Sequence, residues 1–289
     1  MVSYAVANGL TANPRKTHAL LLGSSAYLNS PEVITAPPIL VDDTPVPYSR
    51  QLESLGTIIT LSLNWEEHVN RLSAHVFSSL HSLRFYKHAL TRSLRKRLVE
   101  SLIFPHFDYC CAVYHSLTVK QNLRLHRLLN ACVRYVYGSI PWNARVTPYR
   151  LALGWLSVSR RREYLVGSLA FKVSTFGEPS YLLERLVPVH TRSEIRRSQR
   201  TGGGYFIPFN ARTETLRGSF AHTAVRVVNS LGSAVSSDIT PGEFQSRLWA
   251  HLFSLDRDEW SELARREGLA TLPPQLRDSP SRDVPRARL

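Results

Sequence analysis

The feature that most constrains the fold of this chain is a run of helical periodicity over residues 65–138. Apolar residues recur there at every third or fourth position, and the run is interrupted at Pro105 and ends at Gly138. Because a helix turns once in about 3.6 residues, this spacing places the apolar side chains on one face of each helix. The periodic apolar positions include Val69, Leu72, Val76, Leu80, Leu83, Leu125, Leu129, Cys132 and Val136.

The residues between these apolar positions are largely basic. Residues 65–138 hold eleven Lys or Arg against four Asp or Glu, so the surplus is 11 − 4 = 7 positive charges, half of the formal +14 of the chain. The pI of about 10.1 reflects the same imbalance over all 289 residues. A strongly basic chain most often binds nucleic acid or an anionic membrane surface. Helices with one apolar and one basic face therefore predict contact with a phosphate backbone.

Other features of the sequence indicate the cellular compartment and the class of partner. No apolar run approaches the roughly 20 residues that span a bilayer, and no signal peptide is visible after Met1. The three cysteines, Cys110, Cys111 and Cys132, form no disulfide framework and indicate a reducing compartment. We therefore expect an intracellular protein, nuclear or cytoplasmic, whose partner is nucleic acid and not a membrane.

Short apolar runs bounded by turn-forming residues precede the helical array and predict β-strands. We expect a buried strand at Ala19–Leu22, a hairpin of residues 39–41 and 46–48, and a strand over 55–61. The fold class is therefore mainly α with a small β part. The helices expected from periodicity and end signals cover about 65–89, 91 to the interruption at 105, 118–137, 148–176, 179–187, 219–231 and 242–255.

Changes in composition divide the chain into four parts. Residues 1–63 hold the predicted strands, residues 64–188 form a helical domain, and residues 189–255 form a C-terminal region with two helices. Residues 256–289 are charged and then rich in Pro and Arg, a composition that cannot bury enough apolar surface to become ordered. We expect this last part to be a disordered basic tail.

The order of short motifs along the chain is distinctive. They are Asn8-Gly9-Leu10, Asn13, Lys16-Thr17, Ser54 to Ile59, Leu63-Asn64-Trp65 with His68, Leu102 to Pro105 with Asp108-Tyr109, Leu125 to Ala131 with Arg134, and Ser219-Phe220 with Val227 to Leu231. This order resembles the downstream half of the reverse transcriptase of LINE-like (non-LTR, jockey-type) retrotransposons, and the resemblance covers roughly residues 2–255.

The resemblance implies a role for each part. Residues 1–63 resemble a partial palm, in which Lys16 matches the lysine near the incoming nucleotide and Leu55-Gly56 matches the primer grip. Residues 64–188 resemble the thumb. The complete enzyme uses Mg²⁺ held by aspartates that come before Asn8 in the family, so we expect no catalytic residue, no metal site and no small-molecule substrate in this chain. RNA-directed DNA polymerase is thus the family activity, and the chain alone is expected to be catalytically incomplete.

Two groups of basic residues are the predicted nucleic-acid contacts. The first group lies at the start of a predicted helix, where the helix dipole makes cations unfavourable. This cost suggests that the cations have a function or that one of them is a partner for Glu100. The second group recurs at i, i+4, i+7 and i+14 on one helix face. The first consists of Arg92, Arg95, Lys96 and Arg97, and the second of Lys120, Arg124, Arg127 and Arg134. Arg160, Arg161 and Arg162 form a weaker third group.

Several other motifs are better explained by structure than by chemistry. Asp42-Asp43 precedes Thr44-Pro45 and is typical of a turn, whereas a Mg²⁺ site needs more converging oxygens. The cysteine and histidine residues between 106 and 115 do not match a common zinc spacing, and buried thiols explain them better. Gly202-Gly203-Gly204 lacks the strand, the helix start and the Lys-Ser/Thr of a phosphate-binding loop. These residues are His106, Cys110, Cys111 and His115.

Three functional hypotheses follow. The first is a fragment of a reverse transcriptase that lacks the catalytic aspartates. The second is a basic helical module that binds nucleic acid without catalysis, for which affinity should fall steeply with salt. The third is an unselected fragment without function, which would not bind nucleic acid even at low salt.

Overall fold

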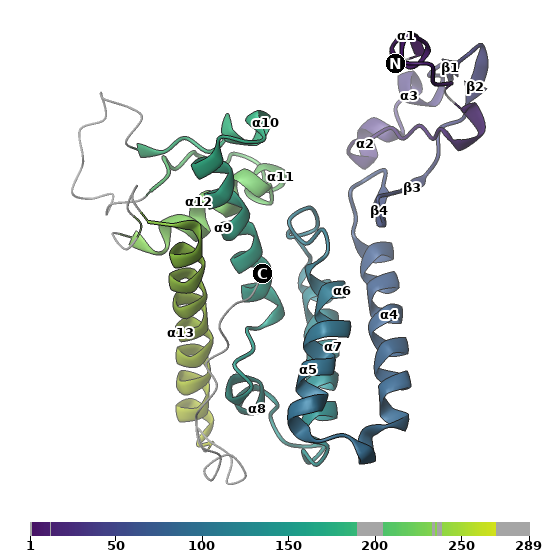
Figure 1. The fold of residues 1–289 in the computed structure, drawn as a ribbon. Helices are drawn as coiled ribbons and strands as arrows, with labels where there is room; N and C mark the ends of the chain where they lie inside the picture. Colours follow the sequence, from purple (N-terminus) through teal and green to yellow (C-terminus); the bar gives the residue numbers. More distant parts are fainter. Residues whose placement is uncertain (1, 12, 190–204, 233–234, 236–238, 270–289) are drawn as a thin grey trace. The chain divides into compact units, whose positions relative to one another are not determined.

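The computed structural model describes residues 2–11, 13–189, 205–232, 235 and 239–269. The chain divides into two compact units, Met1–Leu72 and Ser73–Leu289 (Figure 1). The structure is mainly helical with two small antiparallel sheets, as the sequence predicted. The division falls inside helix α4, Glu66–Phe85, and not at the expected boundary between residues 63 and 64.

The first unit is built around two β-hairpins. Strands β1, Ile39–Val41, and β2, Thr44–Val46, are joined by Asp42 and Asp43, which have φ values of 48° and 57°. Two-residue hairpin loops favour this left-handed backbone, and aspartate adopts it more readily than most residues. The turn interpretation of Asp42-Asp43 is therefore confirmed.

The second hairpin pairs β3, Gln51–Ser54, with β4, Thr57–Thr60. Sequence analysis predicted one strand from residue 55 and missed β3. The short elements of this unit are α1 (Val2–Ala7), the 3₁₀ helix η1 (Pro14–Lys16), α2 (Ser25–Leu28) and α3 (Pro31–Ile34).

The buried strand expected at Ala19–Leu22 is absent. Ala19 is buried and forms one isolated parallel bridge with Tyr48, but Leu22 is 49% exposed. A strand needs a neighbour along its length to pair its backbone groups. Among the described residues, no strand pairs with residues 20–22, so the apolar run stays irregular.

The helices predicted between residues 65 and 138 are confirmed, with shorter bounds. They are α4, the 3₁₀ helix η2 (Lys87–Ala89), α5 (Arg92–Leu102), α6 (Phe104–Asp108) and α7 (Val119–Tyr137). Pro105 lies in the first turn of α6, where its missing N–H costs nothing. Thr118 and Gln121 form a capping box at the start of α7, and Gly138 ends the helix with a φ of 80°.

The remaining helices differ more from expectation. They are α8 (Thr147–Ala152), α9 (Val158–Phe176), α10 (Ser180–Leu183), α11 (Glu214–Arg217), α12 (Phe220–Asn229) and α13 (Pro241–Glu267). The single helix expected over 148–176 is broken by Gly154, which has a φ of 73°. The expected end of order at Leu255 is also wrong, because α13 continues for twelve more residues. Residues 270–289 and Gly202-Gly203-Gly204 lie outside the described residues.

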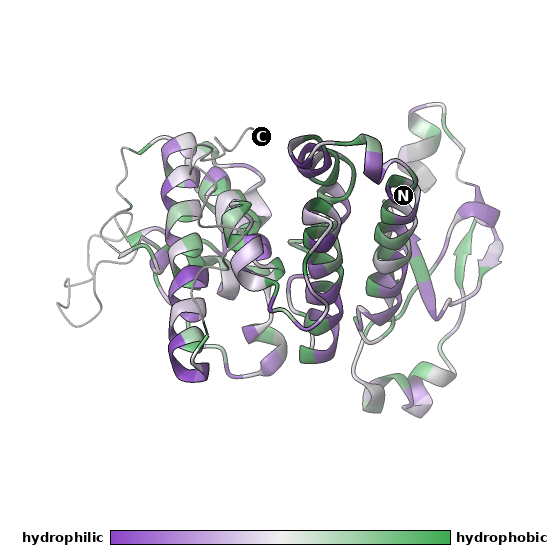
Figure 2. Ribbon diagram, turned by 90° about the horizontal axis from the view of Figure 1, so that it is seen from below, coloured by the Kyte–Doolittle hydropathy of each residue, from purple (hydrophilic) through white to green (hydrophobic). Residues whose placement is uncertain are grey.

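Helix α9 is the centre of the main apolar core. Helices α12 and α13 both pack on it, and Phe171 stacks on Phe244 with a ring-centroid distance of 4.1 Å. A Cβ on Gly167 would lie 2.8 Å from both Leu248 and Val227, so glycine permits the close approach of the three helices. Each long helix carries hydrophobic and hydrophilic residues (Figure 2). This core joins α9, from the expected helical domain of residues 64–188, to α12 and α13, from the expected C-terminal region.

Candidate nucleic-acid interface

Helix α7 has one buried face and one basic face. Leu125, Leu128, Leu129, Cys132, Val133 and Val136 are at most 3% exposed and face the helices that pack on α7. Lys120, Arg124 and Arg127 are exposed. The 19 residues of α7 include no Asp or Glu, so no carboxylate of this helix offsets the three cations. The structure therefore brings three of the four predicted basic residues of this helix together on one surface.

Arg134, the fourth predicted residue, has a structural role. Its Nη1 donates to the carbonyl oxygens of Ile140 and Pro141, and its Nη2 donates to those of Trp142 and Ala144, at 2.9–3.1 Å. The guanidinium thus shapes the loop that follows α7. Its positive charge remains, because carbonyl oxygens do not neutralise it.

The same loop presents an exposed aromatic side chain that sequence analysis did not select. Trp142 is 91% exposed, and the guanidinium carbon of Arg134 lies 5.4 Å from the centroid of its ring. Exposed tryptophan is uncommon because its large ring gains stability from burial. Its position between Pro141 and Asn143 in a predicted loop was the signal that could have identified it.

Some of the cations at the start of α5 contact groups of α7, whereas others are exposed. Arg95 Nη1 donates to the carbonyl oxygen of Tyr135 at 3.0 Å, and the Arg92 guanidinium lies 3.8 Å from the centroid of the Tyr137 ring. Both cations therefore lie at the C-terminal, negative end of α7, where they are favourable. These contacts explain why the N-terminus of α5 carries cations that the dipole of its own helix disfavours.

Three neighbouring cations differ in their partners. Lys96 Nζ lies 3.8 Å from Glu100, so the expected partner of that glutamate is confirmed. Lys87, which sequence analysis did not select, donates to the carbonyl oxygen of Gly138 at 3.3 Å. Arg97 is exposed and has no ion pair within the described ranges. Of the predicted α5 cluster, Arg97 is thus the residue most accessible to a ligand.

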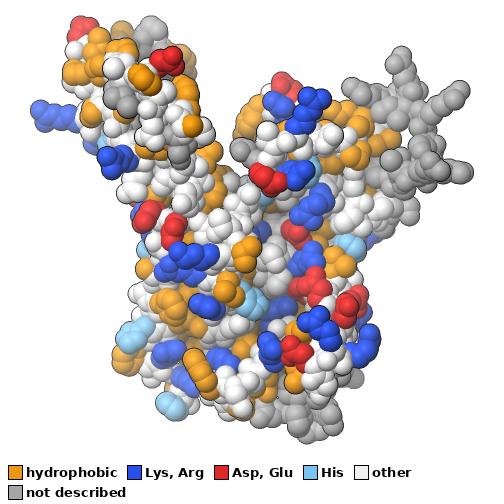
Figure 3. Space-filling model, turned by 180° about the vertical axis from the view of Figure 1, so that it is seen from behind, with side chains coloured by type: hydrophobic (Ala, Val, Ile, Leu, Met, Phe, Trp, Pro, Cys, Tyr) orange, Lys and Arg blue, Asp and Glu red, His pale blue; other side chains and the backbone are white. Residues whose placement is uncertain are grey.

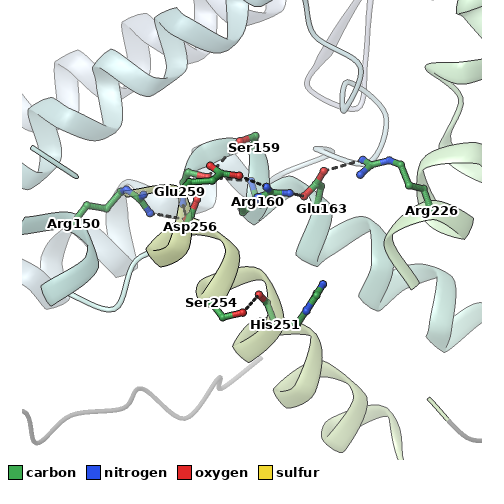
Figure 4. A network of polar contacts seen from close by, with 10 residues as sticks. Arg150, Ser159, Arg160, Glu163, Arg226, His251, Ser254, Asp256 and Glu259 are labelled. Carbon is green, nitrogen blue, oxygen red and sulfur yellow. Dashed lines mark hydrogen bonds and ion pairs between the residues drawn. The ribbon is translucent and has the colours of Figure 1, made fainter. Parts of the chain in front are cut away.

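The third basic group, at the start of α9, is engaged within the protein. Arg160 lies between Glu163 and Glu259, and Glu163 also accepts from Arg226 (Figure 4). Arg161 forms two hydrogen bonds of 2.5 Å with Asp108. Acidic partners hold Arg160 and Arg161, and Arg162 is buried, so these three side chains do not form one exposed basic surface.

Charge is distributed unevenly along the second unit. Residues 73–138 hold ten Lys or Arg and two acidic residues, a surplus of 10 − 2 = 8. The two acids are Glu100, which accepts from Trp155 Nε1 at 2.7 Å, and Asp108, which binds Arg161. On the face shown in Figure 3, red and blue side chains are mixed over the part that holds α9, α12 and α13. Residues 139–289 reach the same surplus, 22 − 14 = 8, over more than twice as many residues, so positive charge is densest along the segment that holds α5 and α7.

The predicted palm residues lie in the first unit. Lys16 is exposed at the end of η1. Leu55 and Gly56 form the two-residue turn between β3 and β4, with φ values of 47° and 75°, and Leu55 is 85% exposed. Turn geometry alone accounts for the glycine, since this backbone conformation favours it. A primer-grip role for the pair stays a prediction.

The cysteines and histidines between residues 106 and 115 have separate environments. His106 stacks on His75 with the ring planes 7° apart, and His115 Nδ1 donates to the carbonyl oxygen of Ala112 at 2.7 Å. Cys111 is buried, and burial raises the pKa of its thiol to about 12. Within the part of the chain that the structure describes, no group of three or more His, Cys, Asp or Glu could hold a metal ion.

The comparisons with known proteins identify no relative. Neither the protein-family models nor the curated proteins nor the solved structures include a match to this chain. Of the helices in the described ranges, none combines the length and apolar character needed to cross a membrane. Functional inference therefore depends on the surface of α5 and α7 and on the order of elements along the chain.

Proposed function

We propose that this chain binds the sugar–phosphate backbone of RNA or DNA through the exposed face of α7 and through Arg97, which is exposed on α5, a helix that packs on α7. The observation that supports this most is the alignment of Lys120, Arg124 and Arg127 on one exposed face of a helix without acidic residues. Such a surface attracts phosphates regardless of base sequence. The opposite, buried face fixes the helix to the protein and so holds the cations in place.

The order of elements supports a relation to reverse transcriptases. A hairpin, a Leu-Gly turn, a strand and then amphipathic helices follow one another, as in the palm-to-thumb region of the resemblance described above. In that family the thumb holds the template–primer duplex. Binding of such a duplex is accordingly the specific form of the proposal, and Mg²⁺-dependent DNA synthesis would require aspartates that the motifs present here do not supply.

Trp142 extends the proposed surface. Arg134 lies on the same helical face as Lys120, Arg124 and Arg127, and it holds the loop that exposes Trp142. An exposed aromatic ring next to cations can stack on an unpaired base, which contributes about 1–3 kcal/mol per base. We therefore expect Trp142→Ala to weaken binding to a template with a single-stranded overhang more than binding to a blunt duplex.

The test is the salt dependence of affinity for an RNA–DNA template–primer. Neutralising Lys120, Arg124 and Arg127 with glutamine should weaken binding and reduce the slope of log K against log salt by about 1 for each lost contact. The matched control replaces Arg257, Arg265 and Arg266, which are exposed on α13, and removes the same total charge. Equal losses for both triple variants would contradict a localised interface.

A separate assay tests the catalytic part of the hypothesis. The chain is mixed with Mg²⁺, template–primer and deoxynucleotides, and incorporation is measured. We expect none. Clear incorporation by the chain, lost when Lys16 is replaced by alanine, would show instead that the palm motifs present here suffice for synthesis.

A further inference from the structure

A cavity of about 280 Å³ lies between the start of α7, the first turns of α9 and the corner between α11 and α12. Asn122 of α7 and Arg162 of α9 line it, and Arg217, His222 and Arg226 line it from the α11–α12 side. One water occupies about 30 Å³ in the liquid, so the cavity has room for a larger polyatomic ion. All of these residues belong to the second unit.

The most unusual residue of this cavity is Arg162, which is only 5% exposed. One of its nitrogens, Nη2, donates to Asn122 Oδ1, whereas Nε and Nη1 are buried without a hydrogen-bond partner among the described residues. An arginine remains charged in proteins, so its burial is costly unless an anion compensates the charge. Burial accordingly lowers the pKa of the Arg162 guanidinium.

The charge of Glu163 provides only part of this compensation, because burial lowers the pKa of Arg162 more than this carboxylate raises it. Glu163 also lines the cavity, but its carboxylate accepts from Arg160 at 3.0 Å and from Arg226 at 2.8 Å. Arg217 is paired with Glu214 on the exposed side. Arg162, Arg217 and Arg226 thus stand against Glu163 and Glu214, a formal surplus of 3 − 2 = 1 positive charge.

The N-terminus of α12 brings further polar groups to this cavity. Helix α12 begins at Phe220 with Ser219 as its N-cap, so the positive end of its dipole lies beside Gly218 and His222, which line the cavity. A Cβ on Gly218 would lie 2.5 Å from Ser116 Oγ, so this close approach requires glycine.

We propose that this cavity binds a phosphate group. Its donors come from different directions, from Arg162 on α9, from Arg226 and His222 on α12, and from Ser116 before α7. The tetrahedral oxygens of a phosphate can accept from all of them, whereas a planar carboxylate has two oxygens. The negative charge of a phosphate would also offset the remaining positive charge of Arg162. The ligand is either a free phosphate ion or the terminal phosphate of a nucleic acid.

The first experiment uses inorganic phosphate as the probe. The midpoint of thermal unfolding, Tm, of the full chain is measured in phosphate and in chloride at equal ionic strength. A ligand that binds only the folded state raises Tm with its concentration, so we expect a rise of several degrees at saturating phosphate. Arg162→Met removes the buried cation and should abolish the rise.

A second variant and a control keep the test informative if Arg162→Met does not fold. Arg226→Met changes a side chain that is 54% exposed, so the protein should fold, and phosphate should raise its Tm less than that of the wild type. Arg257→Met removes an exposed cation of α13 and should leave the rise unchanged. The absence of a rise in the wild type, or equal rises in Arg226→Met and the wild type, would refute the site.

The second experiment distinguishes the two sources of the phosphate. Affinities are compared for one oligonucleotide with a 5′-phosphate and with a 5′-hydroxyl. Tighter binding of the phosphorylated form, lost in Arg162→Met, assigns the site to the end of a nucleic acid. Equal binding, together with the Tm rise, assigns it to free phosphate. Because the first experiment contains no nucleic acid, its result is independent of whether α7 binds RNA or DNA.

Discussion

Arg150 Nη1 lies 2.8 Å from Asp256 Oδ2, and each of these side chains is 3% exposed. The pair joins α8 to the middle of α13 (Figure 4). The same Asp256 oxygen accepts from the backbone N–H of Ser157 at 2.7 Å. Arg150 also donates to the carbonyl oxygen of Trp155. One carboxylate thus connects the two helices to the start of a third, α9.

Asp256→Asn is expected to destabilise the protein by about 3–5 kcal/mol, because it leaves the charge of Arg150 buried without a counter-charge. Chemical denaturation of the purified chain measures this loss. Asp258→Asn makes the same change at an exposed position two residues away and should cost less than about 0.5 kcal/mol. Similar unfolding midpoints for the two variants would show that the buried pair contributes little.

Asp256 also illustrates where sequence reasoning failed. Its segment is rich in charge, and composition alone assigned residues 256–289 to a disordered tail. The buried positions of α13 continue at Asp256, Trp260 and Ala264, at helical spacing, and Arg150 is the partner that makes burial of the first one acceptable. A contact across 106 positions cannot be derived from a local window.

Local signals predicted the helices well where the ends carry their own chemistry. Helix α5 begins after Thr91, and α7 begins after Thr118 and ends before Gly138, close to the expected positions. Such ends are predictable because capping depends on adjacent residues alone. The candidate interface was predicted less completely. Spacing identified the exposed face of α7, but the loop carbonyls that bind Arg134 and the arrangement that exposes Trp142 depend on tertiary structure.

Gly138 offers a test of the contacts around the end of α7. An alanine there would have a strained φ of +80°, and its Cβ would lie 2.9 Å from Arg95 Nη1 and 3.1 Å from Lys87 Cε. Gly177→Ala has similar strain at φ +76° but no atom within 4 Å, so it should cost about 1–2 kcal/mol. Gly138→Ala should cost about 1 kcal/mol more, because Arg95 must leave the carbonyl oxygen of Tyr135. Equal losses in denaturation experiments would mean that Arg95 moves at no cost.

The thiols should differ in reactivity. Burial raises the pKa of both Cys111 and Cys132 to about 12, so at pH 8 only about one in 10⁴ of these groups is the reactive thiolate. Cys110 is partly exposed. We expect a maleimide to label one thiol rapidly in the native chain and three after denaturation. Cys110→Ser should remove the rapid phase, and rapid labelling of this variant would contradict the burial of the other two.

Stability should fall as the solution is acidified below about pH 6.5, because buried histidines resist protonation. Burial is the main cause of the lowered pKa of His106, His115 and His126, and nearby His75 lowers that of His106 further. The unfolded chain therefore binds more protons than the folded chain in the window between the lowered pKa values and the ordinary value of 6.5. By linkage, the free energy of unfolding then increases with pH across this window.

Denaturation at pH 7.5 and at pH 5.5 measures this effect. His106→Phe retains a ring against His75 but cannot be protonated, so it should lose less stability between the two pH values than the wild type does. His88→Phe replaces an exposed histidine and should show the full loss. If both variants lost as much stability as the wild type, His106 would not contribute to the acid sensitivity, and the effect would come from the other histidines whose pKa is lowered by burial, His68, His115 and His126.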